Sequence, residues 1–70
     1  MAKINPEALK AIREKDGHSQ LSLAARSGVA QAHISRLERE PVDVRPTTLK
    51  RLADALGVPQ SALTLVEEPA

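Results

Sequence analysis

The sequence predicts an all-α domain built from five short helices. Seventy residues are enough for one small domain. Three glycines and five prolines divide the chain into short segments, and residues of these two types mark where helices begin and end. No segment of useful length alternates apolar and polar residues with a period of two. We therefore expect no sheet, although residues 63–66 could form an extended edge.

The first expected helix has a signal at each end. Asn5 has a side chain that can cap it, and Pro6 suits the first helical position because an N–H there has no partner within the helix. Gly17 is expected to end the helix in the left-handed conformation. Leu9 and Ile12 mark the buried face.

The next two helices are shorter. Ser19 can cap a helix over residues 20–27 that ends at Gly28. A third helix over about residues 31–39 follows, and Pro41 prevents its continuation. The apolar residues expected to face inward are Leu23 and Ala24 in the second helix, and Ile34 and Leu37 in the third.

The fourth helix has the fullest apolar face of the chain. It begins at Pro46 and ends at Gly57, and its apolar residues lie at i, i+3, i+4 and i+7. These residues are Leu49, Leu52, Ala53 and Leu56. Pro59 begins a last short helix that continues to Leu63. Five short helices with short connections predict a compact all-α domain.

Composition excludes several classes of protein. The absence of cysteine excludes disulfide frameworks, thiolate metal sites and cysteine nucleophiles. A core this small leaves little room for an enclosed substrate cavity, so we expect no enzyme. We expect no metal and no other cofactor, because His18 and His33 are the only imidazoles. The absence of Phe, Trp and Tyr removes the aromatic side chains on which single-strand and RNA-binding modules stack bases. Binding to duplex nucleic acid is not excluded by this composition.

The formal net charge of +1 is a sum over unlike regions. Residues 1–66 hold ten basic and seven acidic side chains, a net +3, and Glu67 and Glu68 lower this value. We therefore expect one domain over residues 1–66 and a disordered acidic tail over residues 67–70. Because no signal-peptide or membrane-spanning stretch is present, we expect a soluble protein of the cytoplasm.

The segment QLSLAARSGVAQAHISRL, residues 20–37, has the residue order of two helices that cross steeply over a tight turn. Ala24 is expected where the two helices approach most closely, and Gly28 can adopt the positive φ that the turn needs. Three apolar residues fill the angle between the helices: Val29, Ile34 and Leu37. The opposite face is left to solvent and carries Gln31, Ala32, Ser35 and Arg36.

The chain resembles the helix-turn-helix domain of the lambda-repressor-like family, the Cro and xenobiotic-response-element type of bacterial and phage regulators. The resemblance covers nearly the whole chain through the segments IREKDGHSQ, SQLSLAARSGVAQAHISRLER and RPTTLKRLADALGVPQSAL. It implies a five-helix domain, with the helix-turn-helix at helices 2 and 3. It also implies that the third helix enters the major groove of double-stranded DNA, usually in a dimer on an inverted repeat.

The resemblance implies that four residues of the third helix contact bases. Gln31 can pair with an adenine edge, and Arg36 can reach guanine O6 and N7 or a flanking phosphate. Ala32 either contacts a thymine methyl or touches nothing. His33 either donates to a guanine or a phosphate, with pH-dependent binding, or is a solvated imidazole. These alternatives stay open.

A second set is expected to bind DNA phosphates: Ser19, Gln20, Ser35, Arg39 and Arg45. Gln20 would also brace Gln31, and Ser19 is more securely a helix cap. Glu40 and Asp43 would oppose the grip of Arg39 and Arg45 unless their side chains point away. The remaining basic residues are interpreted as solvated charges, with Lys3 as a possible short arm: Lys10, Lys15, Arg26, Lys50 and Arg51.

The resemblance assigns structural roles to Arg13 and Glu38, which would form a buried ion pair between the first helix and the end of the third. Ala24 and Gly28 are structural residues of the turn. His18 stands where the family has an apolar residue, and we interpret it as a partly buried structural histidine.

Three residues depart from the family pattern. Ala30 replaces the Ser or Thr cap of the third helix, at a cost of about 1 kcal/mol. Glu40 replaces the glycine that ends that helix, and this predicts an altered turn. Leu21 is apolar at a position that is more often charged, so it either extends a contact surface or covers the core.

The sequence therefore predicts a sequence-specific DNA-binding regulator of Cro-like type that represses by occupying an operator. The alternative is an antitoxin or other protein-interaction module, which would bind a protein partner and use DNA mainly for autoregulation. A homodimer would form through the fifth helix, through residues 64–66 or through DNA-mediated contact.

Overall fold

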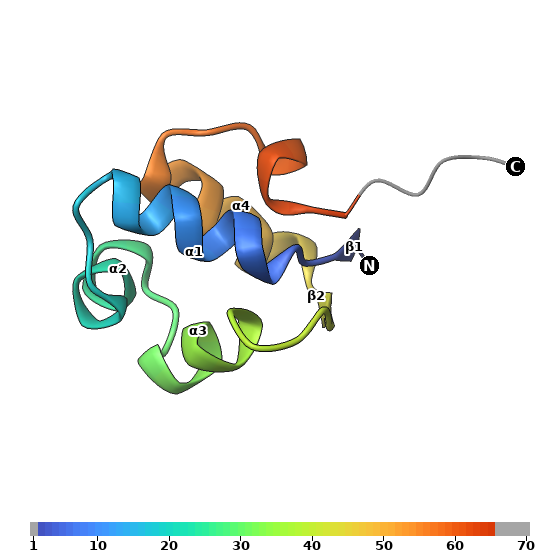
Figure 1. Cartoon of the computed structure of the whole chain (residues 1–70), viewed down its shortest axis with the longest axis horizontal. Coiled ribbons are helices and arrows are strands. Elements are labelled where there is room, and N and C mark those ends of the chain that lie inside the picture. Colours follow the sequence, from blue (N-terminus) through green and yellow to red (C-terminus); the bar gives the residue numbers. More distant parts are fainter. Residues whose placement is uncertain (1, 66–70) are drawn as a thin grey trace, which may run out of the picture.

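The computed structural model describes residues 2–65, and its helices lie close to where the sequence predicts them (Figure 1). The elements in chain order are β1 (Ala2–Lys3), α1 (Pro6–Lys15), α2 (Gln20–Ser27), α3 (Gln31–Leu37), β2 (Asp43–Val44), α4 (Pro46–Leu56) and η1 (Gln60–Leu63). The all-α class is confirmed. The expected fifth helix is the single 3₁₀ turn η1, so the described chain has four α-helices.

The prediction that the chain forms no sheet is wrong, because the structure contains a two-stranded sheet. β1 pairs antiparallel with β2, with Ala2 opposite Val44 and Lys3 opposite Asp43. The extended edge after Leu63 forms as far as the structure describes it, because Thr64 bridges Ile4 and the Leu65 N–H donates to the Lys3 carbonyl at 3.0 Å. Val66 and the acidic tail over residues 67–70 lie outside the described residues.

Local signals set most of the helix ends. The Asn5 side chain accepts from the Ala8 N–H at 3.2 Å, and the Ser19 hydroxyl accepts from the Ser22 N–H at 3.0 Å. Gly28 ends α2 with a φ of 75° and lets the chain turn into α3 without a Cβ penalty. Ala30 begins α3 with no side-chain cap.

The third helix is shorter than predicted, because it ends at Leu37 and not near Arg39. The Arg39 N–H bonds to the Arg36 carbonyl three residues back, and the Glu40 N–H shares the same acceptor at 3.3 Å. Bonds to the third residue back tighten the chain into a turn. The backbone then leads through Pro41 into β2, whose pairing with β1 requires an extended conformation.

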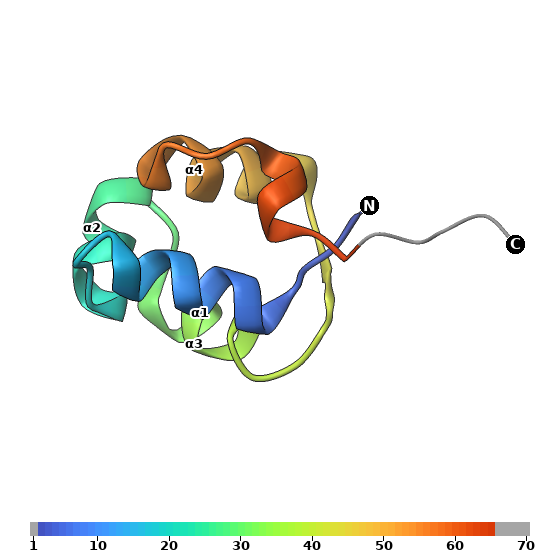
Figure 2. The same ribbon diagram turned by 45° about the horizontal axis from the view of Figure 1, so that its top comes forward.

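The core lies between the helices, with α4 above α1 and α3 below it in the turned view (Figure 2). All four apolar residues predicted for α4 are buried, as are Leu9, Leu23, Ile34 and Leu37. Ile12 and Ala24 are only half-buried and pack against this core. Three buried residues outside the four α-helices close its open end: Ile4, Val44 and Leu63.

The expected buried ion pair is present and joins three segments. Arg13 is 8% exposed, and its guanidinium donates to both Glu38 carboxylate oxygens, from Nε at 2.6 Å and from Nη2 at 3.0 Å. Arg13 Nη1 donates to the His18 carbonyl at 2.7 Å. The hydrogen bond to Glu38 raises the pKa of Arg13 above its ordinary value, so this residue stays charged wherever the domain folds.

Glu38→Ala should destabilise the domain strongly, because it leaves the Arg13 guanidinium buried without its carboxylate. We expect the free energy of unfolding to fall by about 3 to 5 kcal/mol in urea denaturation followed by circular dichroism. Asp54→Ala is the matched control, because Asp54 pairs with Lys50 on the surface at 3.1 Å and should cost less than about 1 kcal/mol. Equal losses in the two variants would contradict the role given to the buried pair.

Ala30→Ser should stabilise the domain by about 1 kcal/mol, because the new hydroxyl can accept from an unpaired N–H in the first turn of α3. The backbone at Ala30 is already non-helical, as an N-cap requires, with φ −58° and ψ 139°. Ser19→Ala is the reciprocal change and should lose a similar amount. The same denaturation measurement checks both, and a loss at Ser19 without a gain at Ala30 would refute the missing-cap argument.

Candidate functional site

α3 lies at an edge of the molecule and turns one face to solvent (Figure 1). Ile34 and Leu37 are fully buried on the inner face, so the helical period places the polar side chains on the outer face. Gln31, Ala32, His33 and Arg36 are exposed, as predicted, whereas Ser35 is half-buried and less accessible than expected. The exposed residues form a continuous surface, which we call the α3 face.

Arg36 on the α3 face is paired with a carboxylate. Its Nε donates to Glu40 Oε1 at 3.3 Å, and the two side chains are 59% and 56% exposed. A pair this exposed contributes little free energy, so it restrains the guanidinium only weakly. Glu40 therefore does not point away from the α3 face, which is the condition under which its charge would not oppose Arg39 and Arg45, but part of this charge is offset by Arg36.

Gln20 lies in the first turn of α2, and its side-chain amide donates to Glu38 Oε1 at 3.1 Å. No hydrogen bond joins it to Gln31 among the described side chains, so the expected bracing of Gln31 is absent from this structure. The contact instead links the start of α2 to the buried ion pair. Ser19 is confirmed as the cap of α2.

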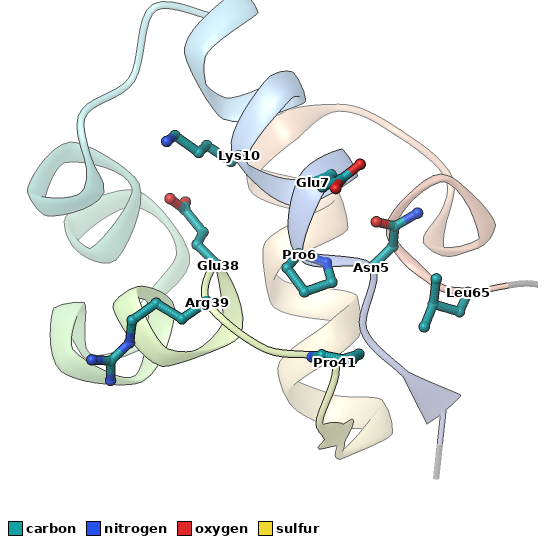
Figure 3. A pocket seen from close by; sticks show the side chains of 8 residues that line it. All are labelled: Asn5, Pro6, Glu7, Lys10, Glu38, Arg39, Pro41 and Leu65. Atoms are coloured by element: carbon teal, nitrogen blue, oxygen red, sulfur yellow. The ribbon is translucent and has the colours of Figure 1, made fainter.

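Arg39 and Arg45 are exposed at the two ends of the segment that joins α3 to α4. Figure 3 shows the Arg39 guanidinium turned away from the neighbouring Glu38 carboxylate, which points toward α1. Arg45 is the N-cap residue of α4 and makes no side-chain capping bond. Both residues are exposed, and Arg45 shares the lining of one hollow with His33 of α3.

The hollow drawn in Figure 3 does not belong to the α3 face. Its volume is about 640 Å³, and it is lined by the start of α1, the turn after α3, and Leu65. Its charged side chains are of both signs, with Lys10 and Arg39 beside Glu7 and Glu38. None of the exposed residues of the α3 face lines it, and its mixed charge favours no particular ligand.

A second hollow lies between the turn that joins α2 to α3 and the first half of α4. It is lined by residues 28–30, His33, Arg45, Thr48 and Arg51. The sequence interpretation treated Arg51 as a solvated charge and assigned no role to Thr48. Nothing in the sequence predicts that Thr48 and Arg51 line the same hollow as His33, because this placement depends on how α4 packs beside the turn.

Gly28 has the positive φ predicted for the turn, at 75°. Ala24 is half-buried against the core, and its carbonyl accepts from the Gly28 N–H at 2.9 Å. The sequence interpretation missed Ser27, which is buried and whose hydroxyl accepts from the Val29 N–H at 3.2 Å. A serine directly before a helix-ending glycine is a usable signal for such a bond.

His18 is a partly buried structural histidine, as predicted. Its Nδ1 shares a hydrogen bond of 2.7 Å with the Ser22 hydroxyl, and its Nε2 lies 3.2 Å from the Asp16 carboxylate. Leu21 is 65% exposed, so it does not cover the core. Within residues 2–65, no three His, Asp or Glu side chains form a group that could hold a metal ion, and no helix there is long and apolar enough to cross a membrane.

Comparison with known proteins places this geometry in a family. Over 58 residues the chain is 43% identical to the HTH-type transcriptional repressor RghR of Bacillus subtilis, and over 50 residues it is 44% identical to the antitoxin HigA1 of Mycobacterium tuberculosis. These alignments cover 81% and 71% of this chain but only 43% and 34% of the relatives. The chain therefore spans less than half the length of these two curated relatives.

A solved structure has the same fold at nearly the same length. The restriction-modification controller protein C.AhdI from Aeromonas hydrophila superposes with a TM-score of 0.76 at 28% identity, over 81% of this chain and 86% of that one. The sequence profile of the Helix-turn-helix family matches residues 9–61, which include all four α-helices except the first residues of α1. With α2 and α3 as its two central helices, the chain belongs to the Helix-turn-helix family, in the lambda-repressor-like form that its sequence resembles.

Proposed function

We propose that the chain is a sequence-specific DNA-binding regulator that represses transcription by occupying an operator with α3 in the major groove. The observation that carries the proposal is the α3 face, where Gln31 and Arg36 are exposed on a helix whose opposite face is buried. The amide and the guanidinium are the groups that pair with adenine and guanine edges. No chemical step is needed for this function, and the bacterial relatives favour action on DNA in a bacterial cytoplasm.

Within this proposal the exposed residues have separate tasks. Gln31 contacts an adenine, Arg36 contacts a guanine once it has left Glu40, and Ala32 contacts a thymine methyl. Phosphates are bound around α3 by Ser19 and Gln20 at the start of α2, and by Ser35, Arg39 and Arg45. Backbone contacts of this kind orient the helix and carry no sequence information.

The low net charge of +1 supports recognition by a few base contacts. A protein gains nonspecific affinity for DNA in proportion to the phosphates that its cations neutralise. The charge of Arg36 on α3 is offset by its ion pair with Glu40. The charge of Arg13 is offset by its ion pair with Glu38 in the interior. Nonspecific binding should therefore be modest, and specificity should depend on the side chains of the α3 face.

We further propose that the chain binds as a homodimer on an inverted repeat. Leu65, the last described residue, is 40% exposed beside η1, and an apolar side chain at that place supports a contact through η1 or residues 64–66. Two-fold symmetry in the protein would then match two-fold symmetry in the operator.

A second candidate function is that of an antitoxin. The 44% identity to HigA1 favours it, and the exposed Leu21 on α2 offers an apolar contact for a protein partner. In that case DNA binding would serve autoregulation. Purification of the tagged protein from its own host would favour this function if one small protein co-purified stoichiometrically through a contact that Leu21→Gln abolishes.

The repressor proposal predicts that selection from random duplexes, repeated at several salt concentrations, enriches one sequence motif. If the chain acts as a dimer, the motif should contain two inverted half-sites with centres about 10 base pairs apart. Failure to enrich any sequence over random duplex would refute sequence-specific regulation. A single asymmetric site would refute the dimer and leave the regulator proposal intact.

Gln31→Ala should weaken binding to the selected duplex by about 5- to 150-fold, because one bidentate base contact discriminates by about 1 to 3 kcal/mol. Arg36→Ala should have an effect of the same size and should relax the preference at a different base position. Lys15→Ala is the matched control, since Lys15 is an exposed basic residue in the last turn of α1, outside both the α3 face and the proposed dimer contact. Fluorescence anisotropy gives the Kd values, and a selected site unaffected by both changes would refute the assignment of the α3 face.

A further inference from the structure

We propose that the hollow lined by residues 28–30, His33, Arg45, Thr48 and Arg51 is a phosphate-binding pocket, and that it takes one backbone phosphodiester of duplex DNA. The inference rests on the proposed DNA-binding function and deepens it. It adds Arg51 and Thr48 to the interface and gives His33 a specific role. The pocket is open to solvent and has a volume of about 470 Å³, so a phosphodiester within an intact duplex can enter it.

The lining of the pocket has the chemistry of an anion site. Arg45 and Arg51 supply guanidinium groups, His33 supplies a ring N–H, and Thr48 supplies a hydroxyl, whereas no carboxylate lines the pocket. Guanidinium donors match the geometry of phosphate oxygens and bind them with charge-assisted hydrogen bonds. The hollow of Figure 3 differs in this respect, because two carboxylates share its lining with Lys10 and Arg39.

The cations of the pocket are not neutralised by neighbours. The ion pairs found between residues 2 and 65 join Arg13 to Glu38, Arg36 to Glu40 and Lys50 to Asp54, and the Asp16 carboxylate lies 3.2 Å from the His18 ring. His33, Arg45 and Arg51 therefore have no carboxylate within 4.0 Å in this part of the chain. Lys50 is adjacent to Arg51 in sequence but is paired with Asp54 at 3.1 Å. The pocket therefore brings together two guanidinium groups that have no ion pair in this part of the chain, those of Arg45 and Arg51.

The start of α4 adds to this positive potential. α4 begins at Pro46, which has no N–H, and its N-cap Arg45 makes no side-chain capping bond. The N–H groups of Thr47 and Thr48 are therefore donors without a partner in the helix. Since Thr48 lines the pocket, the positive end of an eleven-residue helix lies beside the two guanidinium groups and the His33 ring.

The position of the pocket explains why a phosphate contact there matters. His33 lies in the first turn of α3, and Arg39 follows the last turn. With the pocket occupied, α3 would be held to the DNA backbone near both ends, which restricts its angle in the groove. Of the roles left open for His33, this geometry points to the phosphate and not to a guanine.

Arg51→Gln tests the pocket, with Lys50→Gln as the matched control that removes the same charge from the neighbouring position of α4. Arg51 is exposed, so the variant should fold, and thermal unfolding by circular dichroism checks this. On the selected duplex and on a random-sequence duplex, Arg51→Gln should weaken binding by the same factor of about ten. It should also reduce the slope of log K against log salt concentration by about 1. Lys50→Gln should leave the slope unchanged.

The result that overturns the inference is an Arg51→Gln protein with the affinity and slope of Lys50→Gln. A change in the selected motif at one base position would also overturn it, because Arg51 would then contact a base. Binding to the random-sequence duplex tests the pocket even if the selection enriches no motif. A failure of the sequence-specific regulator proposal can therefore be told apart from a failure of the phosphate pocket.

A titration with inorganic phosphate, followed by the NMR signals of His33 and Thr48, separates two sources of the ligand. Saturation by free phosphate, with unchanged DNA binding in Arg51→Gln, would assign the pocket to a small anion and overturn the DNA role. Loss of DNA affinity in Arg51→Gln, with no saturation by free phosphate, would support the phosphodiester of the duplex.

Discussion

The buried pair of Arg13 and Glu38 is the interaction on which the rest of the structure depends. Two charges that are nearly removed from water are tolerated only if their donors and acceptors are satisfied. Here the guanidinium bonds to both carboxylate oxygens and to the His18 carbonyl, and the carboxylate also accepts from Gln20. These bonds connect α1, the start of α2 and the residue after α3. The orientation of α3 against the domain is therefore set by directional bonds as well as by apolar packing.

α3 needs this support because it has little stability of its own. A helix of seven residues without a side-chain cap is too short to form in isolation. Ile34 and Leu37 anchor it in the core on one side, and the positive φ of Gly28 sets its direction relative to α2. The Ser27 hydroxyl satisfies the buried Val29 N–H inside the turn. Packing and turn geometry thus hold an otherwise weak helix at the surface, with its polar residues toward solvent.

The charge distribution explains how a nearly neutral protein can approach DNA. Glu38 is used in the interior, and Glu40 and Asp54 each pair with a cation on their own segment. The guanidinium groups of Arg45 and Arg51 have no such partner in the described chain and lie together beside the start of α4. Net charge counts all these groups equally, whereas a phosphate close to the surface responds to the uncompensated ones, since screening removes distant contributions.

Sequence alone determined the features that depend on neighbouring residues. The caps at Asn5 and Ser19, the glycine stops, the apolar face of α4 and the exposure of Gln31 and Arg36 all follow from spacings within one helix or turn. Family resemblance added the pairing of Arg13 with Glu38. Only the tertiary structure decided the pairing of β1 with β2, the bond from Gln20 to Glu38, and the placement of His33 and Arg51 around one pocket. Helical periodicity states which face a side chain occupies, but contacts between distant segments depend on how the helices pack around the shared core.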